Sequence, residues 1–205
     1  FQPEFLMSGL LFLLLAAVLV WWLTRNSMDR RKKPRQGVSP EQRTLFNLQV
    51  GDVVQRDLRD WIVESILEFN QSGFQWREYY LRDGEEGIWL VVVDDDRLEL
   101  SWMRQVPSHE ISINFPLRDR LVYEGISYRL EEKGLAQYRR ISRNSNQGGP
   151  CRFHDYVAEG GRLLSVEIYV QDASVDTGEI ELCLGERIIP ESLSILPGDG
   201  RSVYA

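Results

Sequence analysis

The chain has 205 residues, enough for one packed domain and a short appendage, and 43% of them are hydrophobic. Its formal net charge is −7, but Arg25 to Arg43 holds seven basic and two acidic residues, leaving 17 basic and 28 acidic residues beyond it. Such an acidic body repels a phosphate backbone, which argues against nucleic-acid binding, and two cysteines, Cys151 and Cys183, are too few for a disulfide scaffold.

An uncharged apolar segment runs from Phe5 to Thr24 near the start of the sequence. Twenty helical residues span roughly 30 Å, the thickness of the hydrocarbon core of a bilayer. The segment ends in Trp21 and Trp22, and indoles favour the membrane interface. Basic residues, which stay on the cytoplasmic side, follow it: Arg25, Arg30, Arg31, Lys32, Lys33 and Arg35. We therefore predict that residues 1–24 hold one transmembrane helix with a short outer N-terminus and a cytoplasmic C-terminal domain.

A secretory signal peptide is the main alternative for this segment. Signal peptides carry basic residues before the apolar run and small residues after it, whereas here the basic residues follow and two tryptophans close the run. Residues 25–47 combine charge with Pro34, Gly37 and Pro40, so we expect a basic juxtamembrane linker. Its basic residues either bind anionic lipid, with a free energy of about 1 kcal/mol for each residue, or serve only to set the orientation of the helix in the membrane.

Residues 48–205 have the hydrophobic period of β-strands. Ile88 to Val93 is a continuous β-rich run, typical of a central strand, and Glu179 to Leu184 alternates strictly between polar and apolar. We also predict a strand over Ile111 to Phe115, a turn at Gly185 and a long loop over Asn144 to Pro150. Short runs separated by glycine turns predict a soluble all-β domain, either a barrel or a sandwich.

Two short segments recur in the same order along this domain. Trp61-Ile62-Val63-Glu64 is similar to Tyr128-Arg129-Leu130-Glu131, and Arg97 to Ser101 is similar to Arg162 to Val166. This order is compatible with two similar halves, although chance similarity between β-strands remains the alternative.

The sequence contains no convincing catalytic constellation. Cys151 and His154 have a spacing seen in metal sites, and Cys183 and His109 could complete a set, but on a strand Cys151 and His154 face opposite ways. The run Asp94 to Asp96 lacks the residue spacing of a calcium-binding loop, so we predict a solvent-exposed turn there. We predict no catalytic residue, no metal and no cofactor.

Aromatic residues are concentrated between Trp76 and Leu90. On an alternating strand Trp76 and Tyr80 share one face, while Arg77 and Tyr79 share the other. If the second face is exposed, Arg77 and Tyr79 are candidate contacts to a protein partner, because Arg and Tyr are enriched at interfaces. The alternative is a strand buried on both faces.

The same region resembles a bacterial family known as domain of unknown function 4178. The resemblance covers about Leu48 to Ile189 and rests on these pieces: Val50-Gly51-Asp52-Val53, Trp76-Arg77-Glu78-Tyr79-Tyr80-Leu81, Trp89-Leu90, Tyr123 to Leu130, Asp155-Tyr156 and Leu164-Ser165-Val166-Glu167. The family implies no activity and no catalytic residues. Membrane-tethered versions look like those of cyanobacteria, which would imply a thylakoid or plasma-membrane location.

Taken together, these features favour a membrane-anchored, non-catalytic interaction module. Such a protein would act as an accessory or assembly factor of a membrane protein complex, because the tether concentrates the domain near membrane partners. The resemblance to cyanobacterial versions implies a photosynthetic complex. The alternative is a carrier that holds a small ligand or lipid in a β-barrel. An apolar cavity would favour the carrier, and a solid core with an exposed aromatic patch would favour the module.

Overall fold

The computed structural model describes residues 43–111, 113, 115–142, 146–174 and 178–199. In these residues it has no α-helix, only two short 3-10 turns, η2 (Ser108–Glu110) and η3 (Pro190–Ser192). The strands are β1 (Val53–Arg56), β2 (Arg59–Gln71), β3 (Phe74–Asp83), β4 (Glu86–Asp94), β5 (Leu98–Val106), β6 (Arg120–Tyr123), β7 (Ile126–Ser142), β8 (Asn146–Ala158), β9 (Arg162–Tyr169), β10 (Glu179–Ile188) and β11 (Ser194–Leu196). The all-β prediction is confirmed for this part of the chain.

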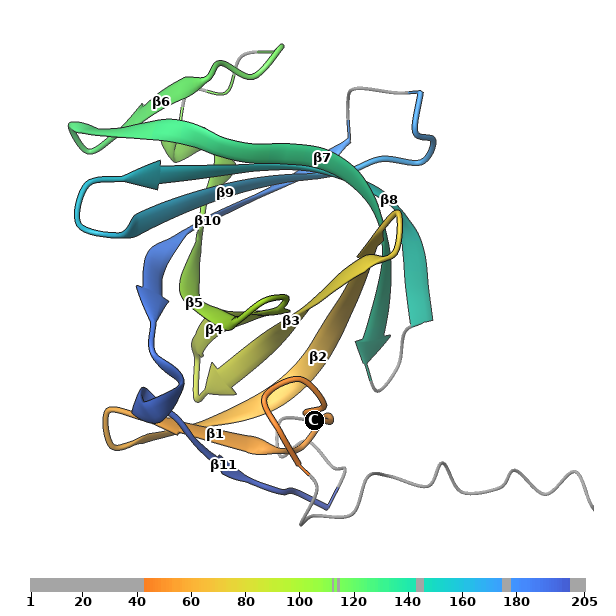
Figure 1. Cartoon of the computed structure of the whole chain (residues 1–205), viewed down its shortest axis with the longest axis vertical. Helices are drawn as coiled ribbons and strands as arrows, with labels where there is room; N and C mark the ends of the chain where they lie inside the picture. Colours follow the sequence, from red (N-terminus) through yellow and green to blue (C-terminus); the bar gives the residue numbers. More distant parts are fainter. Residues whose placement is uncertain (1–42, 112, 114, 143–145, 175–177, 200–205) are drawn as a thin grey trace, which may run out of the picture. The chain divides into compact units, whose positions relative to one another are not determined.

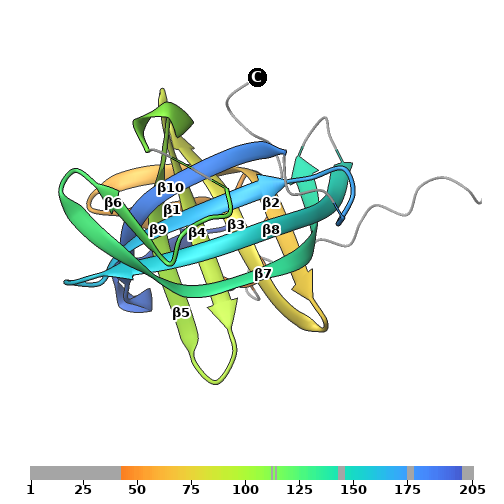
Figure 2. The ribbon, with the colours of Figure 1, turned by 90° about the horizontal axis from the view of Figure 1, so that it is seen from above.

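The sheet closes on itself to form a barrel. Its strand order is β11-β1-β2-β3-β4-β5-β10-β9-β8-β7-β6, and an additional antiparallel pairing joins β2 to β7. The eight strands β2, β3, β4, β5, β10, β9, β8 and β7 therefore form a ring, and seen from above β7 to β10 cross the direction of β3 to β5 (Figure 2). Barrels of eight strands enclose a space just wide enough for side chains or one small ligand.

The two longest strands connect the barrel to the outer layers of the domain. The N-terminal part of β2 pairs with β1 and its C-terminal part pairs with β7, and β7 likewise pairs first with β6 and then with β2 (Figure 1). Each strand has a bulge, between Val63 and Ser65 in β2 and between Leu130 and Glu132 in β7. Bulges bend and twist a strand, which fits the change of partner along each of these strands.

The two halves of the domain repeat one arrangement. A tight hairpin joins β1 to β2 through Asp57 and Leu58, and another joins β6 to β7 through Glu124 and Gly125; all four residues have φ between 48° and 76°. Val54 faces Trp61 in the first hairpin as Leu121 faces Tyr128 in the second. The similarity of Trp61–Glu64 to Tyr128–Glu131 thus marks equivalent positions. The second similarity does not, because Arg97–Ser101 reaches into β5 while Arg162–Val166 lies in β9.

Three hydrophobic clusters hold these layers together. One lies between the first hairpin and β3 to β5 and includes Val54, Trp61 and Tyr79. The second lies between the other hairpin and β8 to β10 and includes Leu121 and Tyr128. The third fills part of the barrel interior, with members Leu67, Phe69, Trp76, Trp89, Met103, Ala136, Cys151 and Phe153. Most barrel strands are therefore covered on both faces.

Three local predictions differ from the structure. The described residues between Ile111 and Phe115 lie outside any strand, because Ile111 turns into the second hairpin's cluster. β10 continues through Gly185, where a Cβ atom would lie 2.0 Å from the Trp102 carbonyl oxygen, so this glycine permits close backbone contact instead of a turn. The predicted loop from Asn144 to Pro150 is largely the start of β8.

The predicted membrane segment, Phe5–Thr24, and the six basic residues after it lie outside the described residues. Within the described ranges, no helix has the length and apolar character needed to cross a bilayer. The transmembrane helix and the cytoplasmic orientation therefore stay predictions from the sequence.

Candidate functional site

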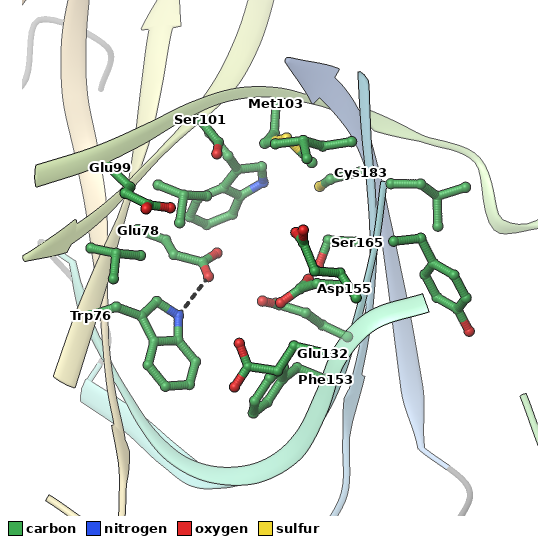
Figure 3. A pocket seen from close by; sticks show the side chains of 18 of the residues that line it. Trp76, Glu78, Glu99, Ser101, Met103, Glu132, Phe153, Asp155, Ser165 and Cys183 are labelled. Carbon is green, nitrogen blue, oxygen red and sulfur yellow. Dashed lines mark hydrogen bonds between the residues drawn. The ribbon is translucent and has the colours of Figure 1, made fainter. Parts of the chain in front are cut away.

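The barrel interior contains a cavity of about 210 Å³. Alternate residues of the ring strands point into it, which is why β3 contributes Trp76 and Glu78 while the residues between and beside them face outward. Exposed residues such as Phe74, Glu131 and Arg187 also line the cavity, so it reaches solvent there. Figure 3 shows side chains from several strands converging on this space.

Aromatic rings form one part of the cavity wall. The ring of Trp76 stacks on Phe69, with centroids 4.8 Å apart, and meets the edge of Phe153 at 5.3 Å. Trp89, from the neighbouring strand β4, contacts Tyr80 at 5.1 Å. Because Trp76 and Trp89 are 8% and 5% exposed, both indoles are held in place by surrounding side chains.

Acidic side chains form another part of the wall, and they far outnumber basic ones. Among the lining residues of the described chain, the one basic side chain is Arg187, which pairs with Glu131 at 2.6 Å. The acidic lining residues are Glu78, Glu99, Glu131, Glu132, Asp155, Glu167 and Glu181. The cavity therefore favours positive charge.

Glu78 and Glu167 are the most deeply buried of these acids. They project from β3 and β9, which are four strands apart in a ring of eight and so lie on opposite walls. Burial raises the pKa of Glu78 well above its ordinary value, and the Glu167 charge raises it further. Burial also raises the pKa of Glu167 to about 7, although hydrogen bonds from Tyr169 and Glu78 oppose that shift. The two carboxyl groups thus share a proton near neutral pH.

Neighbouring polar groups orient this pair. The Trp76 indole donates a hydrogen bond of 3.0 Å to Glu78 (Figure 3). Next to Glu167 on the wall, Ser165 donates a 2.7 Å bond to Asp155, whose pKa burial raises to about 6. Burial also raises the pKa of Glu181. Three strands, β8 to β10, therefore present acids that ionise less readily than in water.

The indole N–H of Trp89 is a buried donor facing this acidic site. It has no acceptor at normal hydrogen-bond geometry, yet it lies close enough to Glu181 to lower the pKa of that carboxyl against the larger effect of burial. Because a buried N–H without a good acceptor is costly, this donor is available to a bound molecule.

The predicted partner contacts, Arg77 and Tyr79, lie on the outer face of β3. Tyr79 is fully buried in the first hairpin's cluster, so the premise that this face is exposed does not hold for it. Arg77 is partly buried, pairs with Glu68 at 3.0 Å and lies over the Phe46 ring. The covering residues Phe46 and Leu48 come from the segment before β1, whose packing the strand alternation alone does not reveal.

The sequence predicts that Cys151 and His154 face opposite sides of a strand and so do not bind one metal ion together. The structure confirms this strand geometry. Cys151 and Phe153 belong to the interior cluster and His154 does not. Both cysteines are free thiols, and Cys183 lines the cavity. In the described part of the chain, no group of three or more His, Cys, Asp or Glu residues is placed to hold a metal ion.

Sequence reasoning missed the acidic interior. Its signal was present, because Glu78 alternates with Trp76 and Tyr80 on one face, and Glu181 alternates with Leu182. A polar residue at a core-facing strand position is unusual unless it serves a function. In the sequence, the face of β10 with Leu182 and Leu184 is apolar, so the opposite face with Glu181 appears solvent-facing. In the structure both faces are covered, so the apolar face is not the only buried one.

Comparison with known proteins identifies relatives but no activity. The sequence model of the family described as Domain of unknown function (DUF4178) matches residues 49–190, as the resemblance predicted. Uncharacterized proteins of Mycobacterium bovis and of two Mycobacterium tuberculosis strains are each 25% identical over 155 residues, covering 72% of this chain and 70% of theirs. No solved structure gives a significant match.

Proposed function

Because the chain belongs to the family described as Domain of unknown function (DUF4178), whose description names no activity, we propose a function from the barrel itself: the β domain binds a small organic molecule in its interior. The observation that supports this proposal is the cavity of about 210 Å³ enclosed by the ring of eight strands. Barrels of this size commonly hold one small ligand.

The cavity volume limits the size of the ligand. An engineered protein cavity of about 150 Å³ takes up benzene, and sites for drug-sized molecules have volumes of about 300–1,000 Å³. A volume of about 210 Å³ falls between these values, which suits a molecule of one ring or a short branched chain.

Small side chains at inward positions account for the space. Ser101 and Ser165 line the cavity on β5 and β9, whereas the Phe153 ring takes up the space beside Gly134 on β7. The large rings of Trp76 and Trp89 do not fill the volume that these residues leave. A hollow with mixed polar and aromatic walls is typical of ligand sites, which need both contact area and orienting groups.

This proposal selects the carrier alternative over the docking module. The docking hypothesis relied on an exposed pair, Arg77 and Tyr79, and Tyr79 is buried. The predicted membrane tether is compatible with ligand binding, since it would confine the barrel to a membrane surface where it receives or delivers its ligand.

Calorimetric titration of the full chain in nonionic detergent tests the proposal. The titrants are benzyl alcohol and 3,3-dimethyl-1-butanol, two neutral molecules of suitable size. We expect saturable binding of at least one, and loss of that binding in Ser101→Phe, because a phenyl ring on β5 would occupy the cavity.

Ser127→Phe is the matched control, since Ser127 is exposed on β7 and does not line the cavity. It should bind as the unmodified chain does. Equal binding by Ser101→Phe and Ser127→Phe would place the ligand elsewhere and contradict the proposal.

A further inference from the structure

The charge of the cavity identifies the class of ligand. Seven acidic side chains line it, and the basic lining residue, Arg187, already pairs with Glu131. On the basis of the proposed ligand-binding function, we propose that the ligand is a small organic cation whose ammonium group lies in the cavity beside the Glu78–Glu167 pair and whose apolar part lies against Trp76, Trp89 and Phe153.

Glu78 and Glu167 are arranged to hold a single positive charge. They face each other from opposite walls, at 8% exposure each, and Trp76 fixes the Glu78 carboxyl through a 3.0 Å hydrogen bond. In the empty barrel a shared proton reduces the repulsion between the two carboxyl groups. An ammonium group on the cavity side of the pair would take over the charge compensation that this proton provides and favour its release.

The aromatic wall favours an organic cation over a bare ion. Indole faces attract cations, and this attraction increases where water is excluded. Trp76, Trp89 and Phe153 all line the cavity beside the carboxyl groups. Quaternary and other alkylated ammonium groups are recognised in this way, because their methyl groups pack against rings while the charge remains.

Trp89 offers a hydrogen-bond donor to the ligand, since its only nearby acceptor among the described residues, Glu181, is poorly aligned. Its indole N–H is buried at 5% exposure and has no acceptor at normal geometry. A hydroxyl, ether or carbonyl oxygen on the ligand would satisfy this donor. A cation that also carries one acceptor oxygen, such as an amino alcohol, therefore suits the site best.

Binding should depend on pH because the cation competes with a proton. The titratable groups that face Glu78 and Glu167 are Asp155 on β8, Tyr169 on β9, and Glu181 and Cys183 on β10, with Cys151 and the Arg140 charge further away. The pKa of Glu167 is about 7, so the fraction of barrels in which Glu167 is ionised rises about tenfold between pH 6 and pH 8. Apparent affinity follows that fraction.

Choline and 3,3-dimethyl-1-butanol provide a direct test, because the two molecules have the same shape and differ by one positive charge. Titrated calorimetrically into the full chain, choline should bind at least tenfold more tightly than the alcohol at pH 8. The choline affinity should fall about tenfold at pH 6, while the affinity for the alcohol stays constant. Since choline is charged at both pH values, the change would belong to the protein.

Two variants assign the effect to the proposed residues. Glu167→Gln should abolish the preference for choline and the pH dependence but keep binding of the neutral alcohol. Glu159→Gln, in the exposed turn after β8, is the matched control and should retain both. If Glu167→Gln fails to fold, the pH dependence of the unmodified chain still tests the inference.

The inference is overturned if choline and the alcohol bind equally at pH 8, or if Glu167→Gln retains the preference. Displacement of choline by equimolar calcium would also overturn it, because an inorganic cation would then be the better ligand. Binding of the alcohol alone would leave the ligand-binding function standing, whereas absence of binding by either molecule would remove that function as well.

Discussion

Buried acids in this domain have two distinct settings. Asp52, at 1% exposure, accepts backbone hydrogen bonds from Gln49 and Gly198 and pairs with Arg43 at 2.8 Å, so its charge is compensated. Among the described residues no cation pairs with Glu78 or Glu167, and both face the cavity. A buried charge without compensation reduces stability, and its persistence at a cavity is typical of functional sites.

The raised pKa values predict how stability depends on pH. A carboxyl group whose pKa is higher in the folded state binds protons more tightly there, so its contribution destabilises the fold as pH rises from the unfolded value, near 4.5, through the folded value. For Glu167 that window ends at about pH 7. Thermal melting of the ligand-free chain should therefore show a lower Tm at pH 8 than at pH 5.

Glu167→Gln should reduce this difference by up to about 3 kcal/mol at pH 8, while Glu78, Asp155 and Glu181 still contribute the rest. Glu159→Gln should melt like the unmodified chain at both pH values. A Glu167→Gln chain that loses as much stability between pH 5 and pH 8 as the unmodified one would show that Glu167 is ionised at no cost.

Arg77 and Tyr79 should differ sharply when each is replaced by alanine. Tyr79 is fully buried, so Tyr79→Ala should lower the free energy of unfolding by about 3–5 kcal/mol. Arg77 is partly buried and ion-paired, so Arg77→Ala should cost about 1 kcal/mol. Chemical denaturation measures both. Similar small losses would mean that the outer face of β3 is not packed as described.

At the scale of elements, the packing of Phe153 between β8 and β7 depends on a glycine. A Cβ atom at Gly134 would lie 2.7 Å from the Phe153 ring and 2.5 Å from the Gln71 amide, whereas at Gly149 on β8 the nearest atoms are 3.7 Å away. Phe153 can approach β7 only because Gly134 has no side chain.

Gly134→Ala should therefore destabilise the domain by about 1–3 kcal/mol through overpacking. Gly149→Ala, the matched control on β8, should change stability by less than about 0.5 kcal/mol. Urea unfolding monitored by circular dichroism distinguishes the two. Equal effects of the two substitutions would show that the interior is free to adjust around Phe153.

The sequence predicted individual strands better than their closure. The continuous run Ile88–Val93 and the alternation in Glu179–Leu184 lie in β4 and β10, because hydrophobic period is a local property. Closure depends on β2 pairing with β7 about 70 residues later, with a bulge in each strand. No local pattern determines such a pairing, so barrel and sandwich could not be separated.

The acidic cavity was missed for the same reason. Which face of a strand is interior depends on closure, and here both faces of most ring strands are covered. Glu78 and Glu167, far apart in sequence, meet only because β3 and β9 are opposite in the ring. The pairing of two acids across a barrel requires the fold to be known first.

At the scale of the whole molecule, the predicted tether would determine the side of the membrane on which the barrel meets its ligand. The order of apolar segment and basic residues predicts that the β domain lies on the cytoplasmic side. Protease added to sealed, right-side-out vesicles should leave residues 43–205 intact until the membrane is permeabilised. Digestion before permeabilisation would reverse the orientation, and the barrel would then meet ligands from outside.

The central claim, that an organic cation binds inside the barrel, is tested most directly by nuclear magnetic resonance of the tryptophan side chains. Trp76 and Trp89 line the cavity, whereas Trp61 and Trp102 pack against each other outside it, with centroids 5.5 Å apart. In the ¹⁵N-labelled full chain titrated with choline at pH 8, the indole N–H signals of Trp76 and Trp89 should shift and saturate, while those of Trp61 and Trp102 stay in place. Shifts confined to Trp61 and Trp102, or four unchanged signals at saturating choline, would contradict the claim.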